Sequence, residues 1–473
     1  MAGPRAGAGL VLPVGGLWRR PGVPSTRALA ALAPGRFRDP FPPASEKHLV
    51  PPGPPGVTAR GRPTPPSSST GRTDPPFFPG PEGPFMTASA IASTARHADL
   101  TDLVSVLRDQ QGRKLDIVAP ASTLHAEHGQ LVIAGTEPIL TPTGVSTSDG
   151  LYQPTAVFEQ GIAAKLGINA PYLRKCRAEA LPLWDANVNG WLERANPGQA
   201  YLVRCLRGTG RSRSGAEPTS GIARALLSDS YKTIDHLDVL TAALDGIDRA
   251  GVPIQIQGCD LTDSHMYVRI YSPAVRVMAP ALLHDYVSPF SGARGADNPT
   301  VWGGFVIRNS EVGAGAATIT PRLVVEICNN GYTITADAHR SVHLGKRLAE
   351  GTVDWSAQTS AANLELITSE TRDAVARFLD PAYVHRVVAD IQAKAGFRIE
   401  EPEKTIKSVS TRLRFTEDQQ NAVFAHFIQG ADLTAGGVMH AVTATAQTLP
   451  DADAAHDMES RALQALHLAA ARP

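Results

Sequence analysis

The chain has little cysteine and no long apolar run. Its 473 residues include 4 cysteines, which stand far apart and form no C-x-x-C pair. This spacing argues against a disulfide framework and a structural zinc site, and it favours a reducing compartment. No segment approaches the roughly 20 apolar residues that cross a bilayer. We therefore expect a cytoplasmic protein that has no membrane partner.

The chain also has no excess of charge, because 45 Lys and Arg residues face 45 Asp and Glu residues. Residues 1–84 carry about ten basic against about four acidic side chains, so the remainder is mildly acidic. Bulk electrostatic attraction to nucleic acid is therefore excluded for the remainder. Any such binding must come from local patches.

No motif specifies a reaction. The glycines match neither the Walker nor the dinucleotide-binding spacing, and the only H-x-x-x-H pair lacks the glutamate of a zinc protease. We expect no cofactor on this basis.

Proline is unevenly distributed, since most of the 38 prolines crowd into the first residues. We predict a disordered leader over residues 1–85, which contains the text PPGPPG and PTPPSSST. Met86 begins a sensible amino terminus, so the leader is either an over-extended start or a dispensable tail. Beyond it we predict an α+β core domain over residues 86–350 and a helical carboxyl region over residues 351–473.

The core should be a mixed, largely antiparallel sheet from about Gly129 to Ile334, flanked by helices. Apolar and polar residues alternate over residues 303–308 and 322–328, and Asn329-Asn330-Gly331 is the strongest hairpin signal in the chain. Residues 235–249 have the periodicity of a helix, which Gly251 should end. The fold class is therefore α+β.

A glycine- and serine-rich loop carries a cluster of arginines. Arg204, Arg207, Arg211 and Arg213 lie in or beside the text RGTGRSRSG. Guanidinium groups and free backbone amides in such a loop can wrap phosphate. The alternative is an ordinary exposed hairpin loop.

A second candidate surface is a strand face. If residues 266–271 form a strand, Tyr267, Arg269 and Tyr271 share one side of it. Single-stranded nucleic acid stacks on aromatic faces of this kind. The alternative is a face that another element covers.

One thiol and two histidines are the only candidates for catalysis or metal binding. Cys328 could act as a nucleophile with His343 as its base. His339 and His343 could instead share a metal ion, with Asp337 or Glu326 as a third ligand. The alternatives are a cysteine that fills the core and a chance spacing of two histidines.

Several blocks of text after residue 117 resemble one family. They include GLYQPTAVFEQGIAAKLGI, RALLSDSYKTIDHLDVL, GGFVIRNSEVGAGAATITPRLVVEICNNG and GGVMHAVTATAQ, and the most specific pieces are LSDSY at residues 227–231, RNS at residues 308–310 with Gly313, and CNNG at residues 328–331 followed by His343. This text resembles the phage/plasmid-like protein family, known as domain of unknown function number 932. The resemblance implies an origin in a bacterial mobile element and supplies no activity.

Three functions remain open at this point. The favoured hypothesis is nucleic-acid binding, for example single-strand binding or annealing in replication or recombination. The alternatives are a structural or host-interaction protein without catalysis and a Cys/His or metal-dependent enzyme. The helical carboxyl region would suit self-association, so a homo-oligomer is one of the expected assemblies.

Overall fold

The computed structural model describes residues 94–136, 139–141, 144–146, 149–208, 221–231, 233–328, 331–341 and 357–471. The predicted leader and the expected start at Met86 lie outside these residues. No helix in the described ranges is both long enough and apolar enough to span a membrane.

The larger of the two main sheets has seven strands, and every pairing in it is antiparallel. Its strand order is β1-β10-β11-β12-β13-β14, and β15 pairs with β13 as well. These strands are β1 (Ala95–Ala98), β10 (Gln255–Leu261), β11 (Met266–Met278), β12 (Thr300–Asn309), β13 (Ala317–Val325), β14 (Gly331–Thr333) and β15 (His339–Ser341).

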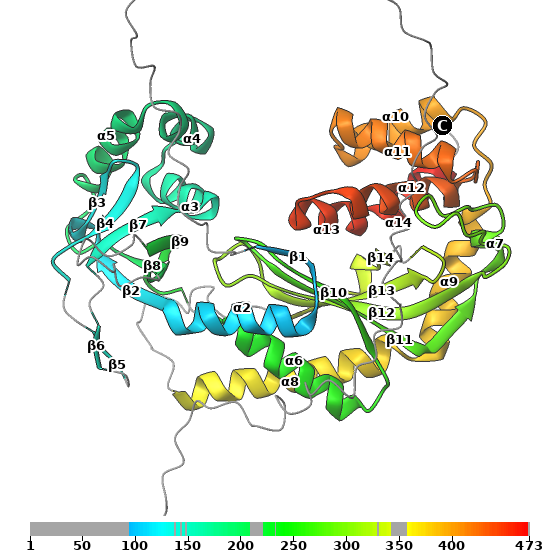
Figure 1. The fold of residues 1–473 in the computed structure, drawn as a ribbon, viewed down its shortest axis with the longest axis horizontal. Helices are drawn as coiled ribbons and strands as arrows, with labels where there is room; N and C mark the ends of the chain where they lie inside the picture. Colours follow the sequence, from blue (N-terminus) through cyan, green and yellow to red (C-terminus); the bar gives the residue numbers. More distant parts are fainter. Residues whose placement is uncertain are drawn as a thin grey trace, which may run out of the picture. The chain divides into compact units, whose positions relative to one another are not determined.

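Helices cover both faces of this sheet, as Figure 1 shows. Helices α6 (His236–Ala250) and α8 (Ala357–Phe378) lie side by side along one face, where residues such as Val268 and Ile270 of β11 are buried. The two helices pack so closely that a Cβ at Gly246 would lie 2.4 Å from the carbonyl oxygen of Thr368. Glycine is therefore required at this helix contact.

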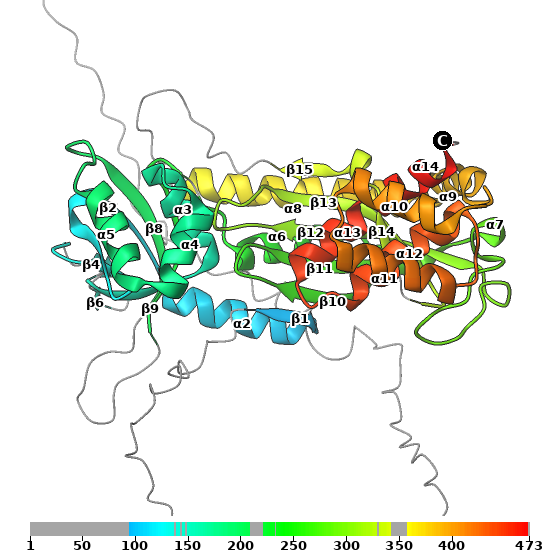
Figure 2. The same ribbon diagram turned by 90° about the horizontal axis from the view of Figure 1, so that it is seen from above.

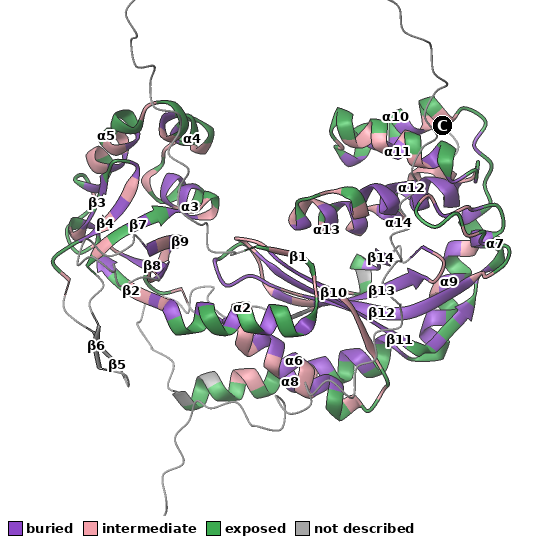
Figure 3. Cartoon of the chain, in the orientation of Figure 1, coloured by how far each residue is buried: buried purple, intermediate pink, exposed green. Residues whose placement is uncertain are grey.

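The helices of the carboxyl-terminal region, apart from α9, lie over the other face (Figures 1 and 2). Helix α12 is buried over Ala435–Ala446, which explains its run of small residues (Figure 3). The region comprises α9 (Pro381–Ala395), α10 (Pro402–Leu413), α11 (Glu417–Gln429), α12 (Ala435–Thr448), α13 (Ala452–Ser460) and α14 (Ala462–Ala470).

The second main sheet has six strands in the order β2-β8-β9-β7-β4-β3. The β7–β9 pair is parallel and the others are antiparallel, so the sheet is mixed. Its strands are β2 (Lys114–Pro120), β3 (Leu124–Glu127), β4 (Gln130–Ile133), β7 (Gly150–Pro154), β8 (Ala200–Leu206) and β9 (Gly221–Ser228).

Helices α3 (Ala156–Leu166), α4 (Ala170–Glu179) and α5 (Leu181–Leu192) belong to the core of this second sheet, where Phe158 and Trp184 are fully buried. The remaining elements are α2 (Leu100–Arg113), α7 (Pro280–Leu283), the 3-10 turns η1 (Ala121–Thr123) and η2 (Thr335–Asp337), and the small hairpin β5 (Ile139–Thr141) with β6 (Gly144–Ser146).

The predicted α+β class is confirmed, and so is the helical carboxyl region. The expected helix over residues 235–249 is α6, and Gly251 ends it with φ +68°. The strands divide between two main sheets, whereas the sequence suggested one. Each sheet has its own apolar cluster. The cluster of the seven-stranded sheet also includes residues of α12 and α14. The predicted domain boundaries stay a prediction.

Candidate anion-binding cavity

A cavity of about 180 Å³ lies against the seven-stranded sheet, on the face that α12 and α13 cover. Three arginines from three different strands line it: Arg96 of β1, Arg269 of β11 and Arg322 of β13. We call this space the arginine cavity. Its other lining residues are His97, Gln257, Gly258, Gln447 and Glu459.

Strand register brings Arg269 and Arg322 to the same face. Both β11 and β13 pair with β12, and Tyr271 and Arg322 are each opposite Gly304, so these two side chains share a face. Arg269 lies two residues before Tyr271 on β11 and therefore points to the same face. Next to Arg322, a Cβ on Gly331 would lie 1.9 Å from the guanidinium carbon, so only glycine leaves room for that group.

Two carboxylates hold the three guanidinium groups. Asp260 accepts from Arg96 Nη1 at 2.6 Å and from Arg269 Nη1. Glu459 of α13 lies 3.3 Å from Arg322 Nη2 and 3.6 Å from Arg269 Nε. Three cations therefore share two carboxylates, which leaves one positive charge in excess. A buried charge is costly unless it is paired, so the cavity favours an anion.

Several polar atoms at the cavity make no hydrogen bond. They are the Nε atoms of Arg96 and Arg322, and also Arg269 Nε and Glu459 Oε2, which form an ion pair at 3.6 Å. Arg322 is 2% exposed and Glu459 is 5% exposed, so bulk water reaches neither side chain well. Leaving a buried polar atom without a hydrogen bond costs about 1–3 kcal/mol. A bound oxyanion would add negative charge and acceptor atoms beside these guanidinium groups.

The pKa shifts differ between the two buried arginines of the cavity. Burial lowers the pKa of Arg322 below the usual arginine value, and Glu459 only partly opposes this shift. At Arg269, Glu459 and Asp260 outweigh burial and raise the pKa. Burial alone would raise the pKa of Asp260 and of Glu459. Neighbouring arginines outweigh it, so both pKa values are lowered and both groups are ionised. The cavity is therefore lined by charged groups of both signs, with cations in excess.

The backbone at the edge of the cavity adopts a rare conformation. His97 has φ +53°, and the pairing of β1 with β10 is irregular between Ala95 and Ala98. The His97 backbone N–H donates to Asp260 Oδ1 at 2.7 Å. A positive φ at a residue other than glycine is uncommon, and strained residues of this kind cluster at functional sites. The strain supports a binding role for this part of β1.

A Ser-His-Asp group beside the cavity does not have the geometry of a hydrolase. Ser264 Oγ and Asp453 Oδ1 both contact Nδ1 of His265, at 2.8 Å and 3.0 Å. Nη2 of Arg308 lies 2.5 Å from the other ring nitrogen, which must accept from it. A triad needs the serine and the carboxylate on different ring nitrogens. Asp453 also accepts from Tyr267, so the group anchors α13 to the sheet.

The structure corrects the predicted stacking surface. Tyr267, Arg269 and Tyr271 do share one strand face, but all three are buried. The Tyr267 ring lies tilted against His456 of α13 with a centroid distance of 4.6 Å, and the Tyr271 ring stacks on Trp302 at 4.6 Å. Because the rings are covered in this way, nucleic-acid bases cannot reach them in this structure. Arg269 instead belongs to the arginine cavity.

The arginine loop prediction is also corrected at its first residue. Arg204 is 1% exposed, and it pairs with Asp116 at 2.8 Å and with Asp235 at 2.6 Å. The backbone N–H of Arg207, at the end of β8, donates to the Arg113 carbonyl at 2.8 Å. Arg211 and Arg213 lie outside the described residues.

Arg204 is one member of a larger cluster, which we call the Arg204 network. Arg204 of the six-stranded sheet bonds to Asp235 at the start of α6. It also donates to the carbonyl oxygen of Glu311 in the turn after β12. The ion-paired members of the network are Lys114, Arg204, Arg224, Asp116, Asp235 and Glu311.

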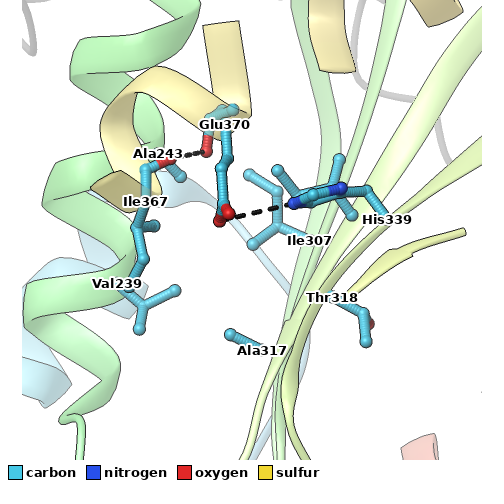
Figure 4. A pocket seen from close by; sticks show the side chains of 10 residues that line it. Val239, Ala243, Ile307, Ala317, Thr318, His339, Ile367 and Glu370 are labelled. Carbon is cyan, nitrogen blue, oxygen red and sulfur yellow. Dashed lines mark hydrogen bonds and ion pairs between the residues drawn. The ribbon is translucent and has the colours of Figure 1, made fainter. Parts of the chain in front are cut away.

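The proposed Cys/His and metal sites are not assembled in the described residues. Cys328 is buried after β13, as core filling would place it. His339 Nε2 lies 3.3 Å from Glu370 Oε2 beside a cavity of about 10 Å³, which holds a single water at most (Figure 4). Asp337 accepts from Tyr383. His343 lies outside the described residues, and within them no group of three or more His, Cys, Asp or Glu could hold a metal ion.

The sequence did not predict the arginine cavity. Arg96, Asp260, Arg322 and Glu459 are far apart in the chain, and each sits in an ordinary local pattern. The one available signal was the presence of charged residues inside otherwise apolar strands. Arg269 and Arg322 both interrupt apolar strand text, VRI and PRLVV.

No family model, no curated protein and no solved structure matches this chain. The resemblance to the phage/plasmid-like family therefore stays a prediction.

Proposed function

We propose that this chain is a binding protein for a small ligand that carries an oxyanion, and that the arginine cavity is its binding site. One observation carries the proposal. Three guanidinium groups share two carboxylates around about 180 Å³ of space, so one positive charge is in excess. Arginine forks suit the planar or tetrahedral oxygens of carboxylates and phosphates.

The size of the cavity limits the ligand. Sites for drug-sized molecules usually measure about 300–1,000 Å³. A space of about 180 Å³ accommodates an oxyanion and a few linking atoms rather than a whole nucleotide. Binding of nucleic acid along an exposed surface stays a separate prediction, because the buried strand face does not support it.

Isothermal titration of the full-length chain with inorganic phosphate, in a buffer free of phosphate and sulfate, tests the proposal. The informative variant is Arg96→Gln, because the Arg96 side chain is 21% exposed and its loss should leave the fold intact. A charge-assisted hydrogen bond is worth about 1.5–3 kcal/mol, so we expect affinity to fall by about 10- to 100-fold.

Arg249→Gln is the matched control. Arg249 is an exposed arginine of α6 that pairs with Glu365 and Asp245, away from the cavity lining. We expect it to bind phosphate as the wild type does. Equal affinity in wild type and Arg96→Gln, or an equal loss in Arg249→Gln, would contradict the proposal.

A further inference from the structure

Glu459 is an unexpected side chain in a cavity for anions. Its Oε1 atom lies 3.3 Å from Arg322 Nη2, and its buried Oε2 atom lies 3.6 Å from Arg269 Nε, which is too far for a hydrogen bond. An ionised carboxylate can only accept hydrogen bonds, so a fully deprotonated oxyanion beside it would be repelled. A ligand that also brings a proton can donate to the Glu459 carboxylate while it accepts from the arginine N–H groups.

We propose that the cavity selects a protonated phosphate, either inorganic phosphate or a phosphate monoester, and that Glu459 accepts the hydrogen bond of its P–OH group. This inference rests on the proposed function and specifies the ligand of the same site. Sulfate has the same shape but no proton at neutral pH, and a phosphodiester has none either. The cavity therefore discriminates by protonation rather than by size.

The charge of the ligand fits as well. A singly protonated phosphate monoester carries one negative charge, which matches the one positive charge in excess at the cavity. Its two unprotonated non-ester oxygens can take hydrogen bonds from guanidinium N–H groups while its hydroxyl donates to Glu459.

Other groups keep Glu459 ionised over the relevant pH range. Arg322 of β13 and Arg269 of β11 face it, as does His456 on its own helix, and His97 of β1 lies close enough to interact with it. Burial lowers the pKa of His456 to about 3, so this imidazole is neutral. The arginines lower the pKa of Glu459 despite its burial. Between pH 5.5 and 8 the proton at stake is therefore mainly that of the ligand.

The wild-type chain alone provides the first test, by titration with inorganic phosphate, sulfate, methyl phosphate and dimethyl phosphate at pH 6. We expect phosphate and methyl phosphate to bind about 10- to 100-fold more tightly than sulfate and dimethyl phosphate, which corresponds to one hydrogen bond to a charged group. Sulfate that binds within about threefold of phosphate would overturn the inference.

Raising the pH separates the two sources of the phosphate group. The second proton of a phosphate monoester leaves near pH 6, so methyl phosphate should lose about tenfold in affinity per pH unit above that value. Inorganic phosphate keeps one proton until strong alkali and should lose less. Methyl phosphate that binds equally at pH 6 and pH 8 would overturn the inference.

Glu459→Gln tests the role of the carboxylate. The new amide can donate to sulfate, so we expect the phosphate-to-sulfate affinity ratio to fall towards one as sulfate binding improves. Glu365→Gln is the matched control, since Glu365 is exposed on α8, and it should keep the wild-type ratio. A folded Glu459→Gln chain that keeps the full ratio would contradict the inference, and if this variant does not fold, the wild-type panel decides.

Failure of this inference is distinguishable from failure of the proposed function. If no anion of the panel binds, the arginine cavity is not an oxyanion site. If phosphate and sulfate bind equally and Arg96→Gln weakens both, the site is real and the selection by protonation is wrong.

Discussion

The chain contains two clusters of buried ion pairs, and they differ in whether their charges balance. In the Arg204 network three cations face three carboxylates. In the arginine cavity three cations face two carboxylates around an open space. Similar side chains therefore produce a closed set of contacts in one region and an incomplete set in the other.

The pKa values of two buried arginines express this difference. Burial would lower the pKa of Arg204, but Asp116, Glu311 and Asp235 outweigh it and raise that pKa. In the arginine cavity the carboxylates likewise raise the pKa of Arg269, but at Arg322 burial prevails and the pKa is lowered. A guanidinium whose charge is disfavoured by burial gains most from an added anion, which is the property expected of a binding site.

The largest effect we predict comes from breaking the balanced cluster. Glu311 is 5% exposed and accepts from Arg224 and from the His236 backbone N–H at 2.8 Å. Glu311→Gln would leave buried arginine charge unpaired and should lower the free energy of unfolding by about 3–5 kcal/mol. Urea unfolding followed by tryptophan fluorescence measures this loss.

Two further variants control this prediction. The double change Arg224→Met with Glu311→Met removes both charges and should recover most of the loss, because a buried pair can be replaced by apolar groups. Arg96→Gln, which brings the arginine cavity to zero net charge, should cost little stability. Equal losses from Glu311→Gln and Arg96→Gln would show that the two clusters do not differ.

Local structure was largely predictable because it depends on residues close in the chain. The helix over residues 235–249 follows from the apolar periodicity of its own residues, and the structure has it as α6 with Gly251 at its end. The same holds for the shared face of Tyr267, Arg269 and Tyr271, which follows from the two-residue repeat of a strand. What covers that face depends on α13, which lies nearly 200 residues later in the sequence.

The candidate site was not predictable for the same reason. From the sequence we predict Arg204 and Arg269 to be exposed cations, because arginine is seldom buried without partners. The partners that allow their burial come from distant elements. Asp235 read correctly as the start of a helix, yet its carboxylate binds Lys114 and Arg204 and makes no side-chain cap. Pairing between distant charges leaves no pattern in local sequence.

The second prediction concerns pH and compares one histidine from each region, the buried His236 and the exposed His97. Burial lowers the pKa of His236 to about 4. Because the unfolded chain takes up this proton near pH 6.5 and the folded chain does not, stability should fall as the pH drops from about 6.5 to about 4. His236→Gln should reduce this loss by up to about 1.4 kcal/mol per pH unit, as measured by urea unfolding at several pH values.

The two carboxylates that interact most closely with His236, Glu311 and Asp235, do not obscure this effect. Their pKa values are lowered in the folded chain at Glu311 and Asp235, so they contribute stability that is present above about pH 4.5 and lost only below it. At the arginine cavity the pKa of His97 is also lowered, chiefly by desolvation, but this residue is exposed to solvent. His97→Gln should therefore change the slope less than His236→Gln, and the reverse order would contradict the comparison.

The third prediction uses one glycine from each region. A Cβ at Gly331 would overlap the Arg322 guanidinium, and a Cβ at Gly313, where φ is +84°, would lie 2.7 Å from Leu227 Cδ2. Gly331→Ala and Gly313→Ala should each cost about 1–3 kcal/mol. Only Gly331→Ala should also weaken phosphate binding, because only this change displaces a cavity arginine. Equal phosphate affinity in the two variants would show that Arg322 is not part of the site.

The smallest effects should come from two buried cysteines that flank charged residues. Cys259 lies between Gly258 and Asp260 on β10, and its side chain belongs to the apolar cluster on the face opposite the arginine cavity. Burial raises its pKa to about 12, so the thiol is unreactive at neutral pH. Cys259→Ala should cost about 1 kcal/mol and leave phosphate affinity unchanged.

Cys205, next to Arg204 on β8, provides the counterpart, and Cys205→Ala should cost a similar amount. Unfolding curves and phosphate titrations of both variants measure these effects. A loss of phosphate binding in Cys259→Ala would mean that the site depends on both faces of the sheet. Unchanged binding would confine it to the face under α12 and α13, where the charges fail to balance.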